Sequence, residues 1–376
     1  MNNVSITEHH NYREYMKHSG FQIPFFALMT AIFASVPVWA AAEEADIQPS
    51  PGAKKLVIEL TLGEKENELK LRPRSMIHLK YDWEPEKQGP EHSLDVTRAR
   101  VGLEAEYGKW LDTEVTLDAR SSDILLDAWG RINFLKQLRL TGGYFKRPFF
   151  KLRMRAAHGV QVIDRGTLDN SLKDGMDYSS RKAGVQLDGR LHKETKLRYF
   201  AGFFGDFEVS RGIVSSNDLA AGLTLKPVKE LRLGASTVFK FLSSEEAHAD
   251  WTAAYDVYLA LDIDNWYMLL EGVAGKDPRY AETPFFTGLI AMMAYTIDIY
   301  ASEPLEGIRP VIKFELMEPD FDIRDDLAMR ATVGMDLLFI YDVRFGLNAE
   351  RVDADRNNRE GEDDGYILMA LMGFRI

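Results

Sequence analysis

The chain has 376 residues, 45% hydrophobic and 28% charged, a balance that is typical of a folded protein and excludes an intrinsically disordered chain. No cysteine is present, which excludes disulfides, thiolate metal sites and cysteine nucleophiles. The formal net charge of -12 excludes a general nucleic-acid binder, because such a protein needs a basic face that displaces counterions from phosphates.

Residues 16–42 have the three parts of a secretory signal peptide. A short basic start with Lys17 precedes an uncharged apolar region from Phe21, and three alanines at 40–42 precede Glu43. Because this pattern begins at Met16, we predict that translation starts there and that residues 1–42 form a removable signal peptide. An uncleaved membrane anchor is the alternative, since the apolar run is about long enough to span a bilayer.

The rest of the chain alternates apolar and polar residues with a period of two, as β-strands with one apolar face do. In residues 75–83, for example, Ile77 and Leu79 alternate with His78 and Lys80. The pattern predicts sixteen strands, near 75–83, 95–107, 112–119, 124–134, 138–145, 181–191, 196–204, 218–226, 230–241, 251–261, 265–275, 284–297, 308–317, 327–337, 341–352 and 365–376.

The predicted connections alternate in length, with short ones such as 108–111 and 135–137 between longer ones such as 84–94 and 353–364. A strand of about ten residues tilted by about 40° crosses an apolar band of about 25 Å, and only a closed sheet leaves no unpaired edge in lipid. We therefore predict an all-β fold, a sixteen-stranded antiparallel transmembrane β-barrel with short periplasmic turns and long external loops, in a Gram-negative outer membrane.

The barrel is predicted to occupy residues 69–376, after an N-terminal periplasmic segment at 43–68. Residues 54–62 (KKLVIELTL) have no place among the sixteen strands. They are expected to form a small plug or a periplasmic strand.

A series of motifs resembles the phosphate-selective (polyphosphate-selective) porin family of Gram-negative outer membranes. The motifs RARVGLEAEY, LLDAWGRINF, GGYFKRPF, VIDRGTLDN and SSRKAGVQLDG follow one another from residue 98 to residue 189. Each motif alone is weakly specific, but the similarity continues through IRPVIKFELMEPD and ATVGMDLLFIYDVRFGLNAERVD and covers nearly all of the mature chain. The resemblance implies a barrel that usually forms a homotrimer and whose third loop folds into the pore.

Residues 146–180 form a connection between two predicted strands, and a connection of this length in a compact protein is usually functional. The resemblance places its basic side chains at or near the pore constriction, where they would offer an anion charge-assisted hydrogen bonds. These residues are Lys146, Arg147, Lys151, Arg153, Arg155, Arg165 and Lys173.

Two alternatives for the basic stretch stay open at this point. Residues 150–155 alternate strictly between apolar and basic, so the preceding strand could continue with its basic face toward the lumen. The basic face could also point outward to anionic lipopolysaccharide.

Other residues predicted to face the lumen carry both signs of charge, so most of them are expected to form ion pairs between neighbouring strands. The basic ones are Arg98, Arg100, Arg131, Arg139, Lys182, Arg198, Arg232, Lys240 and Lys313. The acidic ones are Glu104, Glu106, Glu114, Asp118, Asp188, Asp256, Glu271, Glu315 and Asp336.

The sequence therefore predicts a porin, a water-filled channel for passive diffusion of small solutes, with a preference for anions such as phosphate that rests mainly on the third loop. Outer-membrane lipid and lipopolysaccharide are its other expected partners, and no cofactor and no metal site are predicted. A general or cation-preferring pore and a structural barrel with a blocked lumen are the alternatives, because the net charge is negative. No histidine after residue 42 lies in a nucleophile or zinc motif, so no enzyme activity is predicted.

Overall fold

The computed structural model describes residues 58–63, 68–84, 91–121, 124–205, 216–242, 251–280, 282–299, 304–323, 325–355 and 364–376. The predicted signal peptide and most of the predicted segment at 43–68 lie outside the described residues. The proposed division of the chain into these two segments and a barrel therefore stays a prediction.

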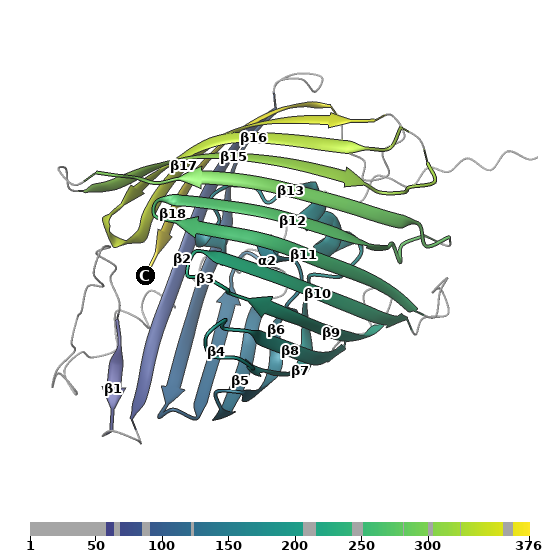
Figure 1. Ribbon diagram of the computed structural model, residues 1–376. Helices are drawn as coiled ribbons and strands as arrows, with labels where there is room; N and C mark the ends of the chain where they lie inside the picture. Colours follow the sequence, from purple (N-terminus) through teal and green to yellow (C-terminus); the bar gives the residue numbers. More distant parts are fainter. Residues whose placement is uncertain are drawn as a thin grey trace, which may run out of the picture. The chain divides into compact units, whose positions relative to one another are not determined.

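Sixteen strands form the wall of a closed antiparallel β-barrel, as the sequence predicted (Figure 1). Each wall strand pairs with the next one along the chain, and β18 pairs with β2 to close the ring. The wall strands are β2 (Leu69–Glu84), β3 (Glu91–Tyr107), β4 (Leu111–Asp118), β5 (Leu125–Leu135), β6 (Leu138–Lys146), β7 (Arg181–Arg190), β8 (Arg198–Gly205), β9 (Ser216–Leu225), β10 (Leu231–Leu242), β11 (Trp251–Ile263), β12 (Trp266–Lys276), β13 (Phe285–Tyr295), β15 (Leu305–Glu318), β16 (Ala328–Phe339), β17 (Val343–Ala354) and β18 (Gly365–Arg375).

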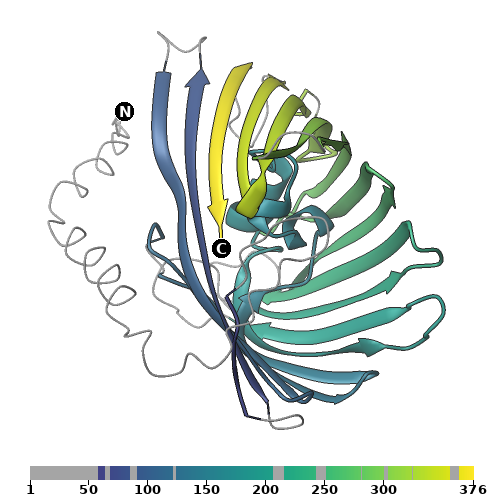
Figure 2. The same ribbon diagram turned by 90° about the vertical axis from the view of Figure 1, so that its left-hand side faces the viewer.

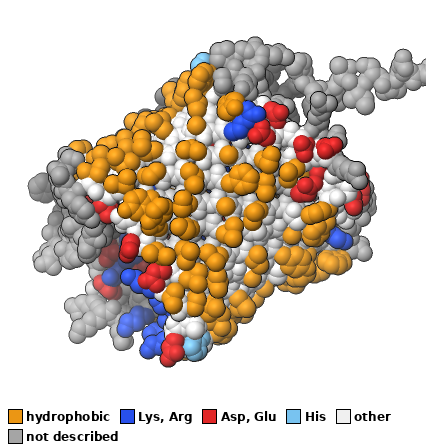
Figure 3. All heavy atoms as spheres, turned by 45° about the horizontal axis from the view of Figure 1, so that its top comes forward, with side chains coloured by type: hydrophobic (Ala, Val, Ile, Leu, Met, Phe, Trp, Pro, Cys, Tyr) orange, Lys and Arg blue, Asp and Glu red, His pale blue; other side chains and the backbone are white. Residues whose placement is uncertain are grey.

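The two faces of the wall have opposite chemistry. In β15, Ile312 and Phe314 are exposed on the outside, whereas Lys313 and Glu315, which alternate with them, are buried inside the barrel. A soluble protein shows the reverse arrangement, so the exposed apolar face is the one that meets lipid. Figure 3 shows apolar side chains spread over the outer face of the wall, with most of the charged side chains near its margins.

One strand begins earlier than the sequence predicted. β2 starts at Leu69 and pairs with β3 from that residue on. Its pairing with β18 reaches only to Met76, which lies opposite Arg375, so the first residues of β2 extend past the end of β18. The open edge that results is partly covered by β1 (Leu60–Leu62), in which Leu60 pairs with Leu71. The end of the 54–62 segment is therefore a strand. A two-residue strand, β14 (Ile297–Asp298), extends the pairing of β15 in the same way.

Residues 147–180, called here the third loop, fold into the barrel instead of continuing β6 upward (Figure 2). The strand ends at Lys146 because Pro148 has no N–H to donate and Phe150 adopts a positive φ of 66°. The continued-strand alternative is therefore wrong. The loop contains α2 (Lys151–Met154), η3 (Ala157–Gly159), α3 (Thr167–Asn170) and η4 (Ser171–Gly175).

An apolar core joins the third loop to the inner wall. Leu152, Leu168 and Leu172 of the loop are buried together with Phe286 and Ile290 of β13. Leu168 packs so closely on the wall that a side chain at Gly288 would collide with it. Among the described residues no helix is long and apolar enough to cross a membrane.

Candidate functional site

Two wall carboxylates hold the beginnings of the two loop helices. Glu271 of β12 accepts hydrogen bonds from the backbone N–H groups of Lys151 and Leu152, the latter over 2.9 Å. Glu315 of β15 accepts one from the N–H of Leu168 over 2.6 Å. The first N–H groups of a helix have no partner within it, so these buried carboxylates act as caps supplied by the wall.

Both ends of the third loop meet in a buried cluster of charges. Arg147 pairs with Asp218 of β9, and its Nε donates to the carbonyl of Tyr178 over 2.9 Å. Asp177 pairs with Lys182 and Lys240 of the wall, each over 2.8 Å. Burial by itself would raise the pKa of Asp177, but the three surrounding cations lower it overall. The carboxylate therefore stays charged and binds the end of the loop to the wall.

The middle of the loop is attached to the opposite side of the barrel. His158 contacts Asp342, in the turn η5 (Ile340–Asp342), with 3.2 Å between Nε2 and Oδ1. Its Nδ1 lies 3.3 Å from Nε2 of His78, and Arg98 lies 2.9 Å from the other ring nitrogen of His78. The lumen-facing Arg98 is thus part of the support of the loop.

The pKa of Asp342 gives this attachment a defined pH dependence. Burial raises the pKa, but His158 and Arg375 outweigh it and lower the value from 3.8 to about 2. A carboxyl whose pKa is lower in the folded state stabilises the fold above its unfolded pKa and loses that contribution as the pH falls through the folded value. We therefore expect the difference in Tm between the wild type and Asp342→Asn to be constant near neutral pH and to shrink between pH 3.8 and about 2. A Tm difference that stays the same between pH 3.8 and about 2 would contradict the lowered pKa of Asp342.

The other basic side chains of the loop mostly contact the loop itself or aromatic rings of the wall. Arg153 pairs with Asp169 over 3.0 Å, and Arg165 donates to the carbonyl of Arg155 over 3.0 Å. The guanidinium of Arg155 lies 4.0 Å from the ring centre of Tyr267. These groups hold the loop in shape, which the sequence alone did not indicate.

Two further lysines of the loop have different surroundings. The ammonium group of Lys151 lies 5.6 Å from the ring centre of Tyr258, and burial, followed by the nearby Arg232, lowers the pKa of Lys151 to about 8. Lys173 is more exposed and pairs with Asp174 over 2.7 Å.

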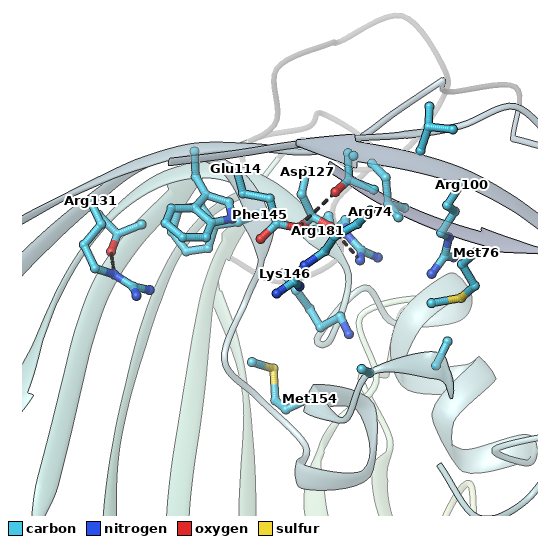
Figure 4. A pocket seen from close by; sticks show the side chains of 18 of the residues that line it. Arg74, Met76, Arg100, Glu114, Asp127, Arg131, Phe145, Lys146, Met154 and Arg181 are labelled. Carbon is cyan, nitrogen blue, oxygen red and sulfur yellow. Dashed lines mark hydrogen bonds and ion pairs between the residues drawn. The ribbon is translucent and has the colours of Figure 1, made fainter. Parts of the chain in front are cut away.

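A cavity of about 410 Å³ lies between the third loop and the wall formed by β2–β7 and the end of β18, and we call it the wall cavity (Figure 4). The loop contributes small or apolar side chains to it, among them Pro148, Met154 and Ala156. The wall strands contribute six cationic side chains, namely Arg74, Arg100, Arg131, Lys146, Arg181 and Arg375. Its acidic lining residues are Glu114 and Asp127.

Four of the six cations have a carboxylate partner. Arg181 binds Asp127 through two hydrogen bonds of 3.0 and 3.1 Å. The other three pairs are Arg100 with Asp118, Arg74 with Glu104, and Arg375 with Asp342.

Arg131 and Lys146 differ, because within the described ranges neither has a carboxylate partner. Arg131 donates to the hydroxyl of Thr141 over 3.0 Å, and Lys146 donates to the carbonyl of Arg153 over 2.8 Å. In Figure 4, Lys146 lies between the wall and Met154, whereas Arg131 lies farther along the wall.

The structure brings only part of the predicted residues to the wall cavity. Lys146, Arg100 and Arg131 line it, whereas the other predicted loop and wall cations do not. Ion pairs between neighbouring strands, which the sequence predicted, are present at Arg100–Asp118 and Arg139–Asp188. Of the remaining wall cations, Lys313 pairs with Glu315 over 3.1 Å, Arg198 is exposed and Arg232 is half-buried.

Sequence reasoning missed three cations of the cavity: Arg74, Arg181 and Arg375. Arg74 was missed because β2 was predicted to begin at residue 75. Continuing its even-numbered inner face backward from His78 would have placed Arg74 in the lumen. Arg181 and Arg375 lie at strand ends, where the alternation gives little information. Among the described residues, no group of three or more histidine, aspartate or glutamate side chains is arranged to hold a metal ion.

No protein-family model and no curated protein sequence matches the chain. Solved structures with a similar fold include OmpF of Salmonella typhi in complex with daunomycin, with a TM-score of 0.62, 10% identity, and coverage of 84% of this chain and 100% of that one. An anion-selective porin from Comamonas acidovorans has a TM-score of 0.56, 10% identity and coverage of 82% and 99%. OmpT of Vibrio cholerae in a trimer form has a TM-score of 0.54, 10% identity and coverage of 82% and 99%.

These similarities show that the chain has the porin fold. A closed sixteen-stranded barrel with an apolar outer band and a polar interior is the architecture of a protein of the Gram-negative outer membrane. The resemblance to the phosphate-selective family stays a prediction.

Proposed function

We propose that the chain forms a water-filled pore for passive diffusion of small solutes, that it prefers anions, and that the wall cavity is the selecting part of the pathway. The observation that carries the proposal is the pair of cations in the cavity, Arg131 and Lys146, that have no carboxylate partner among the described residues, while the other four cations are paired. This local excess of positive charge lies within a chain whose formal net charge is -12.

Selection by such a site follows from electrostatics near a low-dielectric wall. Clustered cations raise the local concentration of anions and replace part of their hydration shell with hydrogen bonds. The basic residues of the third loop have a second role in this proposal, since most of them hold the loop in the lumen and so define the width of the passage. Phosphate, the anion that the sequence resemblance implies, is one solute that this field would attract.

A homotrimer is the proposed assembly. It is implied by the resemblance, and a trimer form is known for OmpT of Vibrio cholerae, which has a similar fold. Band migration of unheated protein in a detergent gel, compared with heated protein, tests the trimer independently of selectivity.

The test of anion preference is the reversal potential of the purified protein in a planar bilayer under a KCl gradient at neutral pH. We expect the sign of an anion-selective pore. The double variant Arg131→Gln, Lys146→Gln removes the two cations without a carboxylate partner and should move the reversal potential clearly toward zero. Lys173→Gln is the matched control, because this lysine belongs to the third loop but does not line the cavity.

Three outcomes would overturn the proposal. A reversal potential of cation-selective sign would mean that the acidic residues of the pore dominate. Equal shifts in the double variant and in Lys173→Gln would remove the wall cavity from the mechanism. A folded barrel without conductance would indicate a blocked, structural barrel.

A further inference from the structure

We propose that the wall cavity preferentially binds organic anions, in which a carboxylate is attached to an aromatic or apolar body, over inorganic phosphate. This inference rests on the proposed function and adds the class of solute. Two features of the lining support it, the pairing of its cations and its apolar surface.

The pairing of the cations leaves few groups for a small, highly charged anion. Inorganic phosphate binds best where several guanidinium groups can each donate charge-assisted hydrogen bonds to it. In the wall cavity the guanidinium of Arg181 already binds Asp127 through two bonds, and Arg74, Arg100 and Arg375 also have carboxylate partners. Among the described residues, Arg131 and Lys146 are left without a carboxylate partner, and either one can bind the single carboxylate of a monoanion.

The rest of the lining suits the apolar part of a solute. Met76, Trp129 and Phe145 of the wall and Met154 of the loop lie around the cavity. Met154 is 38% exposed although it points into a polar lumen, where no lipid contact accounts for an exposed thioether side chain. Contact with this surface does not lower the free energy of a hydrated phosphate. It stabilises a bound aromatic or aliphatic group, because the apolar surface of that group is removed from water.

One pair of residues places the two kinds of contact side by side. The guanidinium of Arg131 lies 4.8 Å from the ring centre of Trp129, and the two residues share the inner face of β5. A carboxylate bound by Arg131 therefore brings its own body against the indole ring. The volume of about 410 Å³ lies within the range of pockets that enclose small organic ligands.

The test measures, in a planar bilayer, the concentration at which each of three anions blocks half of the chloride current. The anions are benzoate, acetate and inorganic phosphate. We expect benzoate to block at a concentration about tenfold lower than acetate, as one favourable aromatic contact allows, and lower than phosphate. Trp129→Ala should remove the difference between benzoate and acetate, and Trp129→Phe should keep most of it.

Trp251→Ala is the matched control, since Trp251 lies on the outside of β11 and is 52% exposed. Stronger block by phosphate than by benzoate would overturn the inference and leave the proposed anion pore intact. Equal benzoate block in the wild type and both Trp129 variants would also overturn it. A cation-selective reversal potential, in contrast, would reject the proposed function itself, so the two failures can be told apart.

Discussion

Replacing Arg147 with methionine is expected to destabilise the folded barrel by about 3–5 kcal/mol, the cost of removing one partner from a buried ion pair. Both Arg147 and Asp218 are completely buried, and the arginine also donates to the carbonyl of Tyr178. Methionine fills a similar volume but leaves the carbonyl without this donor and leaves Asp218 paired with Lys182, at 3.1 Å. The measurement is the urea dependence of unfolding in lipid vesicles.

Lys173→Met is the control for this experiment, because Lys173 is a partly exposed cation of the same loop and pairs with its neighbour Asp174. Exposed ion pairs contribute about 0–1 kcal/mol, so this variant should unfold at a urea concentration close to that of the wild type. Equal stability of both variants would show that the buried pair contributes little.

Removing the two helix-capping carboxylates with Glu271→Ala and Glu315→Ala is expected to release the third loop from the wall. The backbone N–H groups of Lys151, Leu152 and Leu168 would lose their acceptors in a buried site, at a cost of about 1–3 kcal/mol each. The loop should then leave its packed position part of the time. We expect a higher and noisier single-channel conductance, together with faster cleavage of the loop by added protease.

The single variant Glu271→Gln separates charge from hydrogen bonding. Its amide oxygen can still accept a hydrogen bond, so its conductance and its rate of proteolysis should lie between those of the wild type and of Glu271→Ala. Glu194→Ala, in an exposed short turn, is the matched control and should change neither readout. Unchanged conductance and unchanged proteolysis in the double alanine variant would mean that the apolar core and the ion pairs of the loop hold it without these two carboxylates.

The strands of this barrel could be predicted from the sequence because their signal is local. In β15, Ile312 and Phe314 alternate with Lys313 and Glu315, and lipid on one side and the polar lumen on the other require this period of two. The same alternation continues back through residues 69–74, where Lys70, Arg72 and Arg74 occupy the even positions, but the strand was predicted to begin at residue 75 and so Arg74 was missed. The position of the third loop was predicted from its length and from the resemblance of its motifs.

The partners of the charged residues could not be predicted, because they are set by contacts between distant parts of the chain. Arg147 and Asp218 are separated by 71 positions, and Glu271 caps a helix 119 positions away. No pattern of spacing distinguishes a buried, paired arginine from one that faces the pore.

The sequence by itself determined a sixteen-stranded barrel, its lipid-facing side and a long third loop rich in basic residues. Only the tertiary structure decided that most of these basic residues hold the loop in place. It also decided that the cations next to the open space come from β2, β3, β5, β6, β7 and β18. The physical reason is that alternation follows from the nearest neighbours of each residue, whereas the pairing of a buried charge depends on which strands the closed sheet brings together.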